Sequence, residues 1–354
     1  MPVELKKQGL HLTGTPLWLD AKRKSELSFV SHAHSDHIAR HERVIATAAT
    51  LSLLQERLGV VKAPLAVPYR RPFELGPLIL ELFPAGHVLG SAQLRITRPD
   101  GRRITYSGDV NREAGLTAEP LEVAECDTLV LESTFGHPRF RLPPRAETLD
   151  EVVKWVKRQL GHGRTPILYA YPLGKAQEAI AHLERAGFPV VCHASTHAIC
   201  EVYRAHGVKL SPRKFDGTIH AGEVGLFPPF GRSQALKALP KRSTAVLTGW
   251  AMEPNIAGRY GADVAFPLSD HSDCEGLAKY AEATGAEEIV THHGYADELA
   301  AHLRGKGMVA RAVRQALQLN FGFLETRATE PKPSPKKPRR RSRRAPNSDL
   351  RPPR

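Results

Sequence analysis

Four potential metal ligands stand close together in the segment Ser31–His37. In an extended chain the side chains of His32 and His34 point the same way, because successive side chains alternate between two faces. If the chain then turns into a helix, Asp36 and His37 face a second point nearby. Imidazole nitrogens and a carboxylate suit zinc, so the segment predicts the beginning of two metal sites. The alternative is a set of solvated histidines after a strand, a poor choice for a surface loop without a metal.

Two further potential ligands follow predicted strands elsewhere in the chain. His87 comes after a strand and a Pro-Ala-Gly turn, where site residues are common. Asp109 follows another strand, and Gly108 allows a close approach of the backbone there. Each alone would be a capping or surface residue, but with the first segment they complete two sites for ions roughly 3.5–4 Å apart. One ion would be held by His32, His34 and His87, the other by Asp36, His37 and His293, with Asp109 as the bridge.

The elements that position these residues are short apolar strands alternating with amphipathic helices. Strands predicted at 27–31, 78–83 and 128–131 each lead directly to candidate residues, and a hairpin over 92–107 turns at a Pro-Asp-Gly sequence. After a Pro- and Arg-rich seam, regular alternation of helix and strand predicts a mostly parallel sheet of its own. The remaining predictions are helices at 48–58, 146–160, 174–186, 196–206, 274–284 and 296–306, and strands at 165–171, 188–191, 264–267 and 288–291.

The H-x-H-x-D-H string, with a later His and Asp at strand ends, resembles the metallo-β-lactamase superfamily. The segment Leu129–Gly136 resembles the first motif of its β-CASP branch, whose members process nucleic acids. Pro172–Glu178 is similar to the entry of that branch's inserted domain. Pro267–Asp273 and Val290–Gly294 are similar to its last two histidine motifs. Within the branch, residues 8–325 look most like the bacterial DNA ligase-associated exonucleases.

The resemblance implies an α/β fold with two parts and a tail. An αββα metallo-β-lactamase sandwich would comprise residues 1–142 and 264–325, and an inserted β-CASP α/β domain would comprise residues 143–263. Residues 326–354 contain seven prolines and eleven Lys or Arg. Such a composition cannot bury enough apolar surface to fold alone, so a disordered basic C-terminal tail is expected.

The resemblance also implies a catalytic group beside the metal ligands. His271 is expected to be the general acid that protonates the leaving oxygen, and Glu132 is expected to orient it. A role for His271 as a zinc ligand is the alternative. Asp36 is expected among the catalytic residues as well as among the ligands.

Two assignments near the ligands depend on the alignment with the family pattern. Asp20 resembles the aspartate that orients a ligand histidine from behind, although any aspartate at a strand end could look similar. The last motif offers two adjacent histidines. The family pattern His-Gly aligns His293 as the ligand, with His292 as the alternative.

Phosphate-binding residues are expected in the inserted domain. Ser195 and Thr196 stand at a predicted strand-to-helix turn, where backbone amides can bind a terminal phosphate. A plain Ser/Thr helix cap is the common alternative. Lys175 is a further candidate, its alternative being an ordinary solvated charge.

The favoured function is a two-zinc phosphodiesterase, with Mn²⁺ able to replace zinc. It would be a DNA exonuclease acting in DNA repair with an ATP-dependent DNA ligase. An RNA nuclease resembling ribonuclease J or the 3′-end-processing enzymes is the rival, because the metal site cannot tell sugars apart. A small-molecule hydrolase of the same fold is disfavoured by the inserted domain and the basic tail. A catalytically inactive nucleic-acid-binding scaffold is disfavoured because every expected ligand position is filled.

Charge and composition agree with a polyanionic partner such as DNA or RNA. Of the formal net charge of +13, +9 comes from residues 327–354, which leaves +4 for the rest of the chain. Basic residues that neutralise phosphates release counterions, although such a tail could simply aid solubility. The four cysteines form no C-x-x-C pair and are expected to be reduced. No apolar run is long enough for a membrane span, and the N-terminus lacks the apolar core of a secretion signal, so a cytoplasmic location is expected.

Overall fold

The computed structural model describes residues 3–229, 236, 239 and 241–313. The predicted disordered tail at 326–354 lies outside the described residues. By their internal contacts, residues 1–316 form one compact unit. The predicted domain boundaries at 142/143 and 263/264 both fall within that unit, so they stay predictions. None of the helices in the described ranges has the length and hydropathy needed to span a bilayer.

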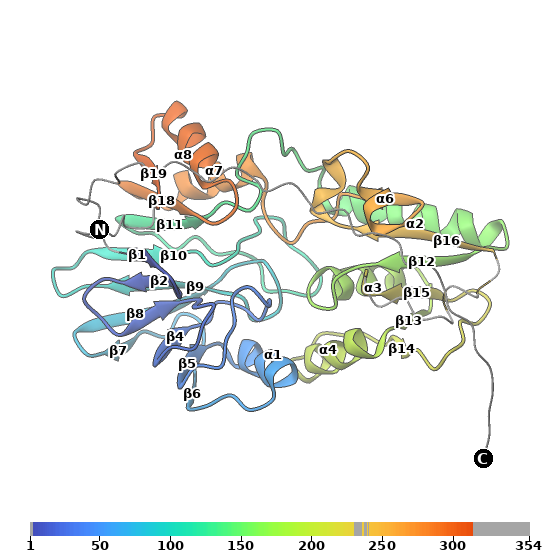
Figure 1. Ribbon diagram of the computed structural model, residues 1–354, viewed down its shortest axis with the longest axis horizontal. Coiled ribbons are helices and arrows are strands. Elements are labelled where there is room, and N and C mark those ends of the chain that lie inside the picture. The colour runs from blue at the N-terminus through green and yellow to red at the C-terminus, as the bar shows by residue number, and fades with distance from the viewer. Residues whose placement is uncertain (1–2, 230–235, 237–238, 240, 314–354) are drawn as a thin grey trace, which may run out of the picture. The chain divides into compact units, whose positions relative to one another are not determined.

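In the first sheet (Figure 1), the strand β4 ends shortly before the histidine segment. Its order is β1-β2-β3-β4-β5-β6, antiparallel up to β3 and parallel from β3 onward. Because β3 and β4 run parallel, Asp20 after β3 lies beside Ser31 after β4, and the Ser31 amide donates to Asp20 Oδ1 at 2.7 Å. The strands are β1 Val3–Lys6, β2 Gly9–Leu12, β3 Leu17–Leu19, β4 Leu27–Phe29, β5 Arg43–Ala46 and β6 Pro64–Ala66.

The second sheet gathers the remaining candidate ligands at one edge. Its order is β19-β18-β11-β10-β9-β8-β7, with parallel pairing from β10 to β19 and antiparallel pairing from β7 to β10. The strands β8, β10, β11 and β18 therefore run in the same direction, and the residues after their carboxyl ends meet. The strands are β7 Phe73–Leu75, β8 Leu78–Pro84, β9 Ala92–Thr97, β10 Arg103–Tyr106, β11 Thr128–Glu132, β18 Glu288–His292 and β19 Ala310–Ala312.

The two sheets pack face to face, and helices cover their outer faces. Side chains alternate across each strand. Val130 and Val290 therefore join a buried cluster with the first sheet, while Leu129 and Ile289 pack against helices on the other side. On the first sheet, Val44 faces a helix in the same way. This is the predicted αββα sandwich, whose helices are α1 Ala48–Leu58, α7 Cys274–Ala283 and α8 Ala296–Gly305.

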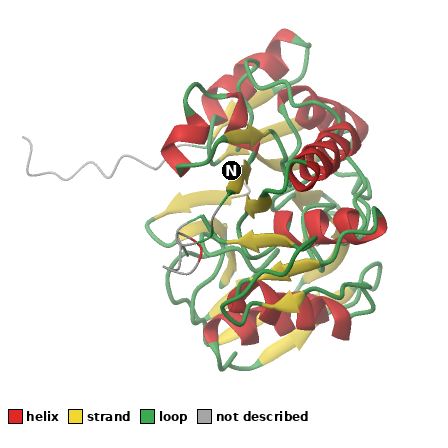
Figure 2. Cartoon of the chain, turned by 90° about the vertical axis from the view of Figure 1, so that its right-hand side faces the viewer, coloured by secondary structure: helices red, strands yellow, loops and turns green. Residues whose placement is uncertain are grey.

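The third sheet is entirely parallel, as its alternating helices and strands predict. Its order is β14-β13-β15-β12-β16-β17, and buried clusters on both faces hold its helices (Figures 1 and 2). β17 pairs with β16, so this sheet extends past residue 263. The helices are α2 Arg145–Gly161, α3 Lys175–Arg185, α4 Ala194–Ala205, η1 Gly249–Met252 and α6 Ile256–Tyr260. The strands are β12 Thr165–Tyr169, β13 Val190–Cys192, β14 Arg213–Lys214, β15 Val224–Phe227, β16 Arg242–Leu247 and β17 Val264–Phe266.

A buried carboxylate, Glu178 on α3, ties the third-sheet region to the sandwich. It accepts hydrogen bonds from the Leu116 amide at 2.9 Å and the Thr117 hydroxyl at 2.7 Å. Burial alone would raise the pKa of Glu178. The hydrogen bond from His182 and the nearby Arg145 guanidinium outweigh burial and lower the pKa to about 2. The charged form of Glu178 therefore stabilises the folded chain.

Replacing Glu178 by glutamine is expected to lower the free energy of unfolding by about 1–3 kcal/mol at neutral pH. Because the folded pKa lies below the ordinary value of 4.5, the contribution of Glu178 is full above pH 4.5 and is lost as the pH falls toward 2. Urea unfolding of both proteins between pH 3 and 7 measures this. A difference between them that stays constant with pH would contradict the assignment.

Candidate metal centre

Four side chains converge at the edge where the strands of the sandwich end. His34 Nδ1 lies 3.0 Å from His87 Nε2, and Asp109 Oδ2 lies 3.4 Å from His32 Nε2 and 3.7 Å from His87 Nε2. One ligand atom from each of the four residues falls within 4.8 Å of all the others. His32, His87 and Asp109 are buried. The set is the one expected from the sequence for the first ion.

The expected second set approaches the same carboxylate through His37. His37 Nε2 lies 3.3 Å from Asp109 Oδ2 and 3.6 Å from Asp36 Oδ2. His293 Nε2 is 3.9 Å from Asp36 Oδ2. Asp36 and His37 stand in a turn rather than in a helix. Asp109 Oδ2 therefore lies close to histidines of both expected sets, and its role as a bridge stays a prediction.

The donors in these two sets suit divalent ions. The Nε2 atoms of His32 and His37 are buried without a hydrogen-bond partner, a costly arrangement unless something else binds them. In the first set, burial lowers the pKa of His32 well below its usual value and that of His34 to about 4. In the second set, burial also acts to lower the pKa of His37, but the Asp109 and Asp20 carboxylates outweigh burial and raise that pKa well above its usual value. Neutral imidazoles with free lone pairs are the form that binds metals. Imidazole and carboxylate groups together fit zinc or a similar ion.

The two adjacent histidines of the last motif, His292 at the end of β18 and His293 just after it, have different surroundings. His292 is buried, and its ring lies 5.4 Å from the ring of Tyr106. Burial lowers the pKa of His292 to about 3. His293 has a side chain that is 33% exposed and reaches toward Asp36. The structure therefore brings His293, rather than His292, to the carboxylate of the second set.

Asp20 lies next to the ligand histidines and contacts His37, Ser31 and Tyr106. Its Oδ2 is 2.9 Å from His37 Nδ1 and accepts a hydrogen bond from the Tyr106 hydroxyl at 2.8 Å. The Ser31 hydroxyl lies 2.9 Å from His32 Nδ1 and donates to the same Asp20 carboxylate. These contacts fix ring orientation, the role that such outer partners play at metal sites. The sequence signalled Asp20 but gave no sign of Ser31 or Tyr106.

His271 stands beside the ligand sets and is paired with a carboxylate. Its Nδ1 lies 3.1 Å from Glu132 Oε1 and 3.9 Å from Asp109 Oδ2. Burial lowers the pKa of His271, but the Glu132 and Asp109 carboxylates outweigh it and raise the pKa above its usual value. Glu132 is fully buried and also accepts the Val110 amide at 2.8 Å. The structure thus brings together the expected acid and the residue expected to orient it.

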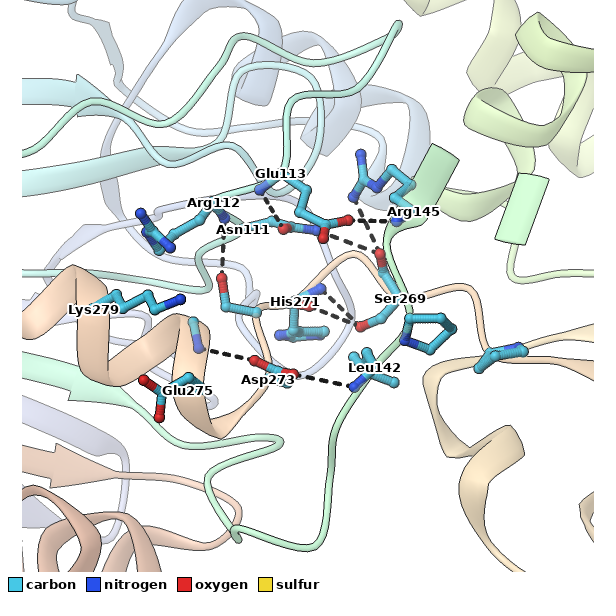
Figure 3. A pocket seen from close by; sticks show the side chains of 14 residues that line it. Asn111, Arg112, Glu113, Leu142, Arg145, Ser269, His271, Asp273, Glu275 and Lys279 are labelled. Atoms are coloured by element: carbon cyan, nitrogen blue, oxygen red, sulfur yellow. Dashed lines mark hydrogen bonds between the residues drawn. The ribbon is translucent and has the colours of Figure 1, made fainter. Parts of the chain in front are cut away.

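The loop that carries His271 is fixed by hydrogen bonds from several directions (Figure 3). The His271 amide donates to the Ser269 hydroxyl at 3.0 Å. Arg145 and Asn111 both donate to the Ser269 carbonyl, at 3.1 and 3.4 Å. A cavity of about 220 Å³ lies on this side of the loop, lined by these four residues among others. His271 is therefore held by the backbone as well as by Glu132.

The inserted region reaches the first ligand set through Lys175. Its ammonium lies 2.6 Å from Asp270 Oδ2, and its side chain is only 11% exposed. The Asp270 carbonyl lies 2.8 Å from His87 Nδ1, and the Leu173 carbonyl lies 3.2 Å from His34 Nε2. Lys175 was expected to bind phosphate, but in the structure it is paired with a carboxylate. It also lines the cavity that His34 and His271 border, so its phosphate-binding role stays a prediction.

Replacing Lys175 by methionine is expected to weaken zinc binding by less than the ~10–100-fold that loss of a direct partner of a metal ligand costs, because Lys175 contacts the Asp270 side chain and not a ligand itself. Competition with a chromophoric chelator measures the affinity. Lys154→Met, which breaks an exposed ion pair with Glu151, is the matched control. The double variant K175M/D270N leaves no buried charge unpaired and separates a zinc effect from unfolding. Unchanged zinc affinity in both variants would contradict this prediction.

The two remaining phosphate-binding candidates lie at the start of α4. The Ser195 amide lies 3.2 Å from His193 Nδ1, and the Thr196 side chain is fully buried. Other residues line the two cavities that His271 borders. The structure therefore does not bring Ser195 and Thr196 to the ligand cluster, and their phosphate-binding role stays a prediction.

Known proteins resemble this chain over different parts of its length. No family model matches it. The Probable DNA ligase of Opitutus terrae is 36% identical over 327 residues, which cover 91% of this chain and 32% of that protein. An RNase J-like protein of Methanocaldococcus jannaschii is 26% identical over 43% of this chain and 41% of its own. RNase aCSPSF2 of Saccharolobus solfataricus is 27% identical over 45% of this chain and 38% of its own.

A likeness in structure extends further than the ribonuclease matches. A protein of unknown function from Enterococcus faecalis V583 has a TM-score of 0.55 at 14% identity, covering 75% of this chain and 74% of that one. At that identity the likeness supports the fold alone. This chain spans about a third of the length of the Opitutus terrae protein and less than half of the two archaeal ones.

Two packed sheets covered by helices, with a His and Asp cluster at their strand ends, define a metallo-β-lactamase fold. Between β11 and α7 this fold is interrupted by the parallel third sheet and its helices. With the curated relatives, these features show that the chain belongs to the β-CASP branch of the metallo-β-lactamase superfamily.

Proposed function

We propose that the chain is a phosphodiesterase that uses two zinc ions to hydrolyse nucleic acid, most specifically a DNA exonuclease acting in DNA repair with a DNA ligase. One observation carries the proposal. Histidines of both expected ligand sets lie within 3.7 Å of Asp109 Oδ2, and a His–Glu pair lies beside them. Nucleic-acid-processing relatives of the same branch support the substrate class.

The residues that would hold the ions follow from the two sets. His32, His34 and His87 would hold one, Asp36, His37 and His293 the other, with Asp109 shared. When bound, such ions supply Lewis-acid chemistry, since they make water nucleophilic at neutral pH and neutralise charge on a phosphate. Mn²⁺ suits the same carboxylate and imidazole donors.

The chain's own part in the reaction is to supply a proton to the leaving oxygen. His271 faces Glu132 through Nδ1, which leaves Nε2 to hold the proton that the leaving oxygen takes. Glu132 keeps the ring in this orientation and favours its protonated form. Asp20 orients His37 through Nδ1 in the same manner.

DNA is favoured because of the relative that matches most of the chain. The Probable DNA ligase of Opitutus terrae is about three times as long as its matched part, which leaves room in that protein for the ligase of its name. A nuclease segment and a ligase in one chain would prepare and seal the same DNA end. We propose that this chain acts beside an ATP-dependent DNA ligase in the same way.

An RNA nuclease is the second candidate, because two relatives bear ribonuclease names. End-labelled DNA and RNA strands of one sequence separate the two. Each is offered with a 5′-phosphate, a 5′-hydroxyl or a blocked 3′ end, in zinc or in manganese. We expect stepwise shortening of the DNA and a dependence on one type of end. Cleavage of RNA alone would overturn the DNA assignment, and internal cuts in blocked strands would overturn the exonuclease.

A further inference from the structure

A cavity of about 300 Å³ opens directly beside the metal centre. Its lining includes His34, Asp36 and His271, so a phosphate held by the ligand cluster would lie at its edge. Three aromatic residues from distant parts of the chain also line it: Phe135 after β11, Tyr171 after β12, and Trp250 in η1. A ligand in this cavity would therefore meet both polar catalytic groups and flat rings.

The ring of Trp250 is held in place from behind. It lies 4.6 Å from the ring of Phe135 and 5.5 Å from that of Phe140. The Thr248 hydroxyl accepts a hydrogen bond from the Trp250 amide at 3.3 Å, which fixes the start of η1. Phe135 is itself buried between Trp250 and His271, whose ring lies 5.9 Å away. Aromatic contacts therefore connect the stacking surface to the expected general acid.

Two residues of the cavity lining, Tyr171 and Arg57, are exposed enough to meet a ligand. Tyr171 has 43% of its surface exposed, and its phenol is hydrogen-bonded to Tyr260. Arg57 is an exposed cation that lines the same cavity. Flat rings beside a cation and a phosphate site suit a nucleotide, because every base has a π-face that stacks on aromatic side chains.

We propose that this aromatic cavity holds one unpaired nucleobase next to the phosphate under attack. The inference rests on the proposed function and adds a substrate class to it: strands whose end is single-stranded. A base within a duplex has both faces covered by its neighbours and its edge engaged in pairing. It can stack on Trp250 only after leaving the helix. The lining residues His34, Asp36 and His271 then lie next to the phosphate of the same strand.

The test compares Trp250→Ala with wild type on two strands of equal length, ten thymidines and ten abasic residues. On the thymidine strand we expect kcat/KM to fall ~5–150-fold, the size of a lost base–aromatic stack. On the abasic strand, which has nothing to stack, the fall is expected to be several-fold smaller. Trp250→Phe keeps a ring and should recover most of the loss. Trp18→Phe, on β3, is the control.

An equal loss on both strands in Trp250→Ala would overturn the inference, as would equal cleavage of both strands by wild type. If Trp250→Ala fails to fold, Tyr171→Ala repeats the comparison at a more exposed position. An equal loss of kcat/KM on both strands in Tyr171→Ala would also overturn the inference. A wild type that holds zinc and cuts neither these strands nor any end-labelled DNA or RNA would instead refute the proposed function. The two failures are thus distinguishable.

Discussion

Replacing His271 by alanine is expected to cut turnover by ~10²–10⁴-fold while the zinc content stays at the wild-type level. The reason is geometric. His271 Nδ1 is engaged by Glu132, and the ring stands beside the two ligand sets without being needed to complete either. Turnover on labelled DNA and elemental analysis of the same sample give the two readings.

The controls for this variant separate a proton donor from a ligand. Glu132→Gln retains the side-chain shape but removes the negative charge that orients His271 and favours its protonated form. This variant should therefore lose activity while keeping zinc. Ala at the exposed position His220 controls for the loss of a histidine elsewhere. A His271→Ala protein that loses zinc together with activity would show that His271 is a ligand.

Asp109→Asn is expected to lose metal and activity together. The carboxylate lies within 3.7 Å of the Nε2 atoms of His32, His37 and His87, so an amide there replaces a shared negative charge with a neutral group. Loss of a residue that only contacts a metal ligand costs ~10–100-fold in metal affinity. Loss of a ligand shared by both ions should lower the metal affinity by at least ~100-fold. Zinc titration monitored by calorimetry measures the change.

A matched control for Asp109→Asn exists in the same hairpin region. Asp100 lies in the exposed turn between β9 and β10, where its Oδ1 accepts the Arg102 amide. Asp100→Asn should bind zinc as wild type does. If Asp109→Asn bound two zinc ions with wild-type affinity, the bridging role would be wrong, whatever its activity.

Local patterns in the sequence were enough to predict much of the fold. The helix predicted at 48–58 has those bounds in α1, and the hairpin around Pro99 to Gly101 joins β9 and β10. The short strands β1, β2, β3, β5, β6, β7 and β14 and the buried strands β15 and β16 were not predicted. Strands of three or four residues carry little periodicity, and a parallel strand buried on both faces shows no alternation.

The metal ligands were recognisable because all seven lie either in one dense segment or shortly after the end of a strand. The residues that position the ligands were not recognisable from the sequence, because they act through backbone carbonyls and hydroxyls, which occur throughout any sequence. Leu173 contributes a backbone carbonyl, and Ser31 and Tyr106 contribute hydroxyls. Lys175 was noticed for its charge, and its partner Asp270 could be known only from the fold. The aromatic cavity unites segments that are far apart in sequence, so no local pattern could reveal it.

We propose that seven side chains of this chain hold two divalent ions that share Asp109. A crystal of the full chain grown with zinc and measured at the zinc absorption edge tests this arrangement. Two anomalous peaks are expected, one among His32, His34 and His87 and one beside His37 and Asp36. A map with zinc elsewhere on the chain, and no peak within bonding distance of Asp109, would contradict it.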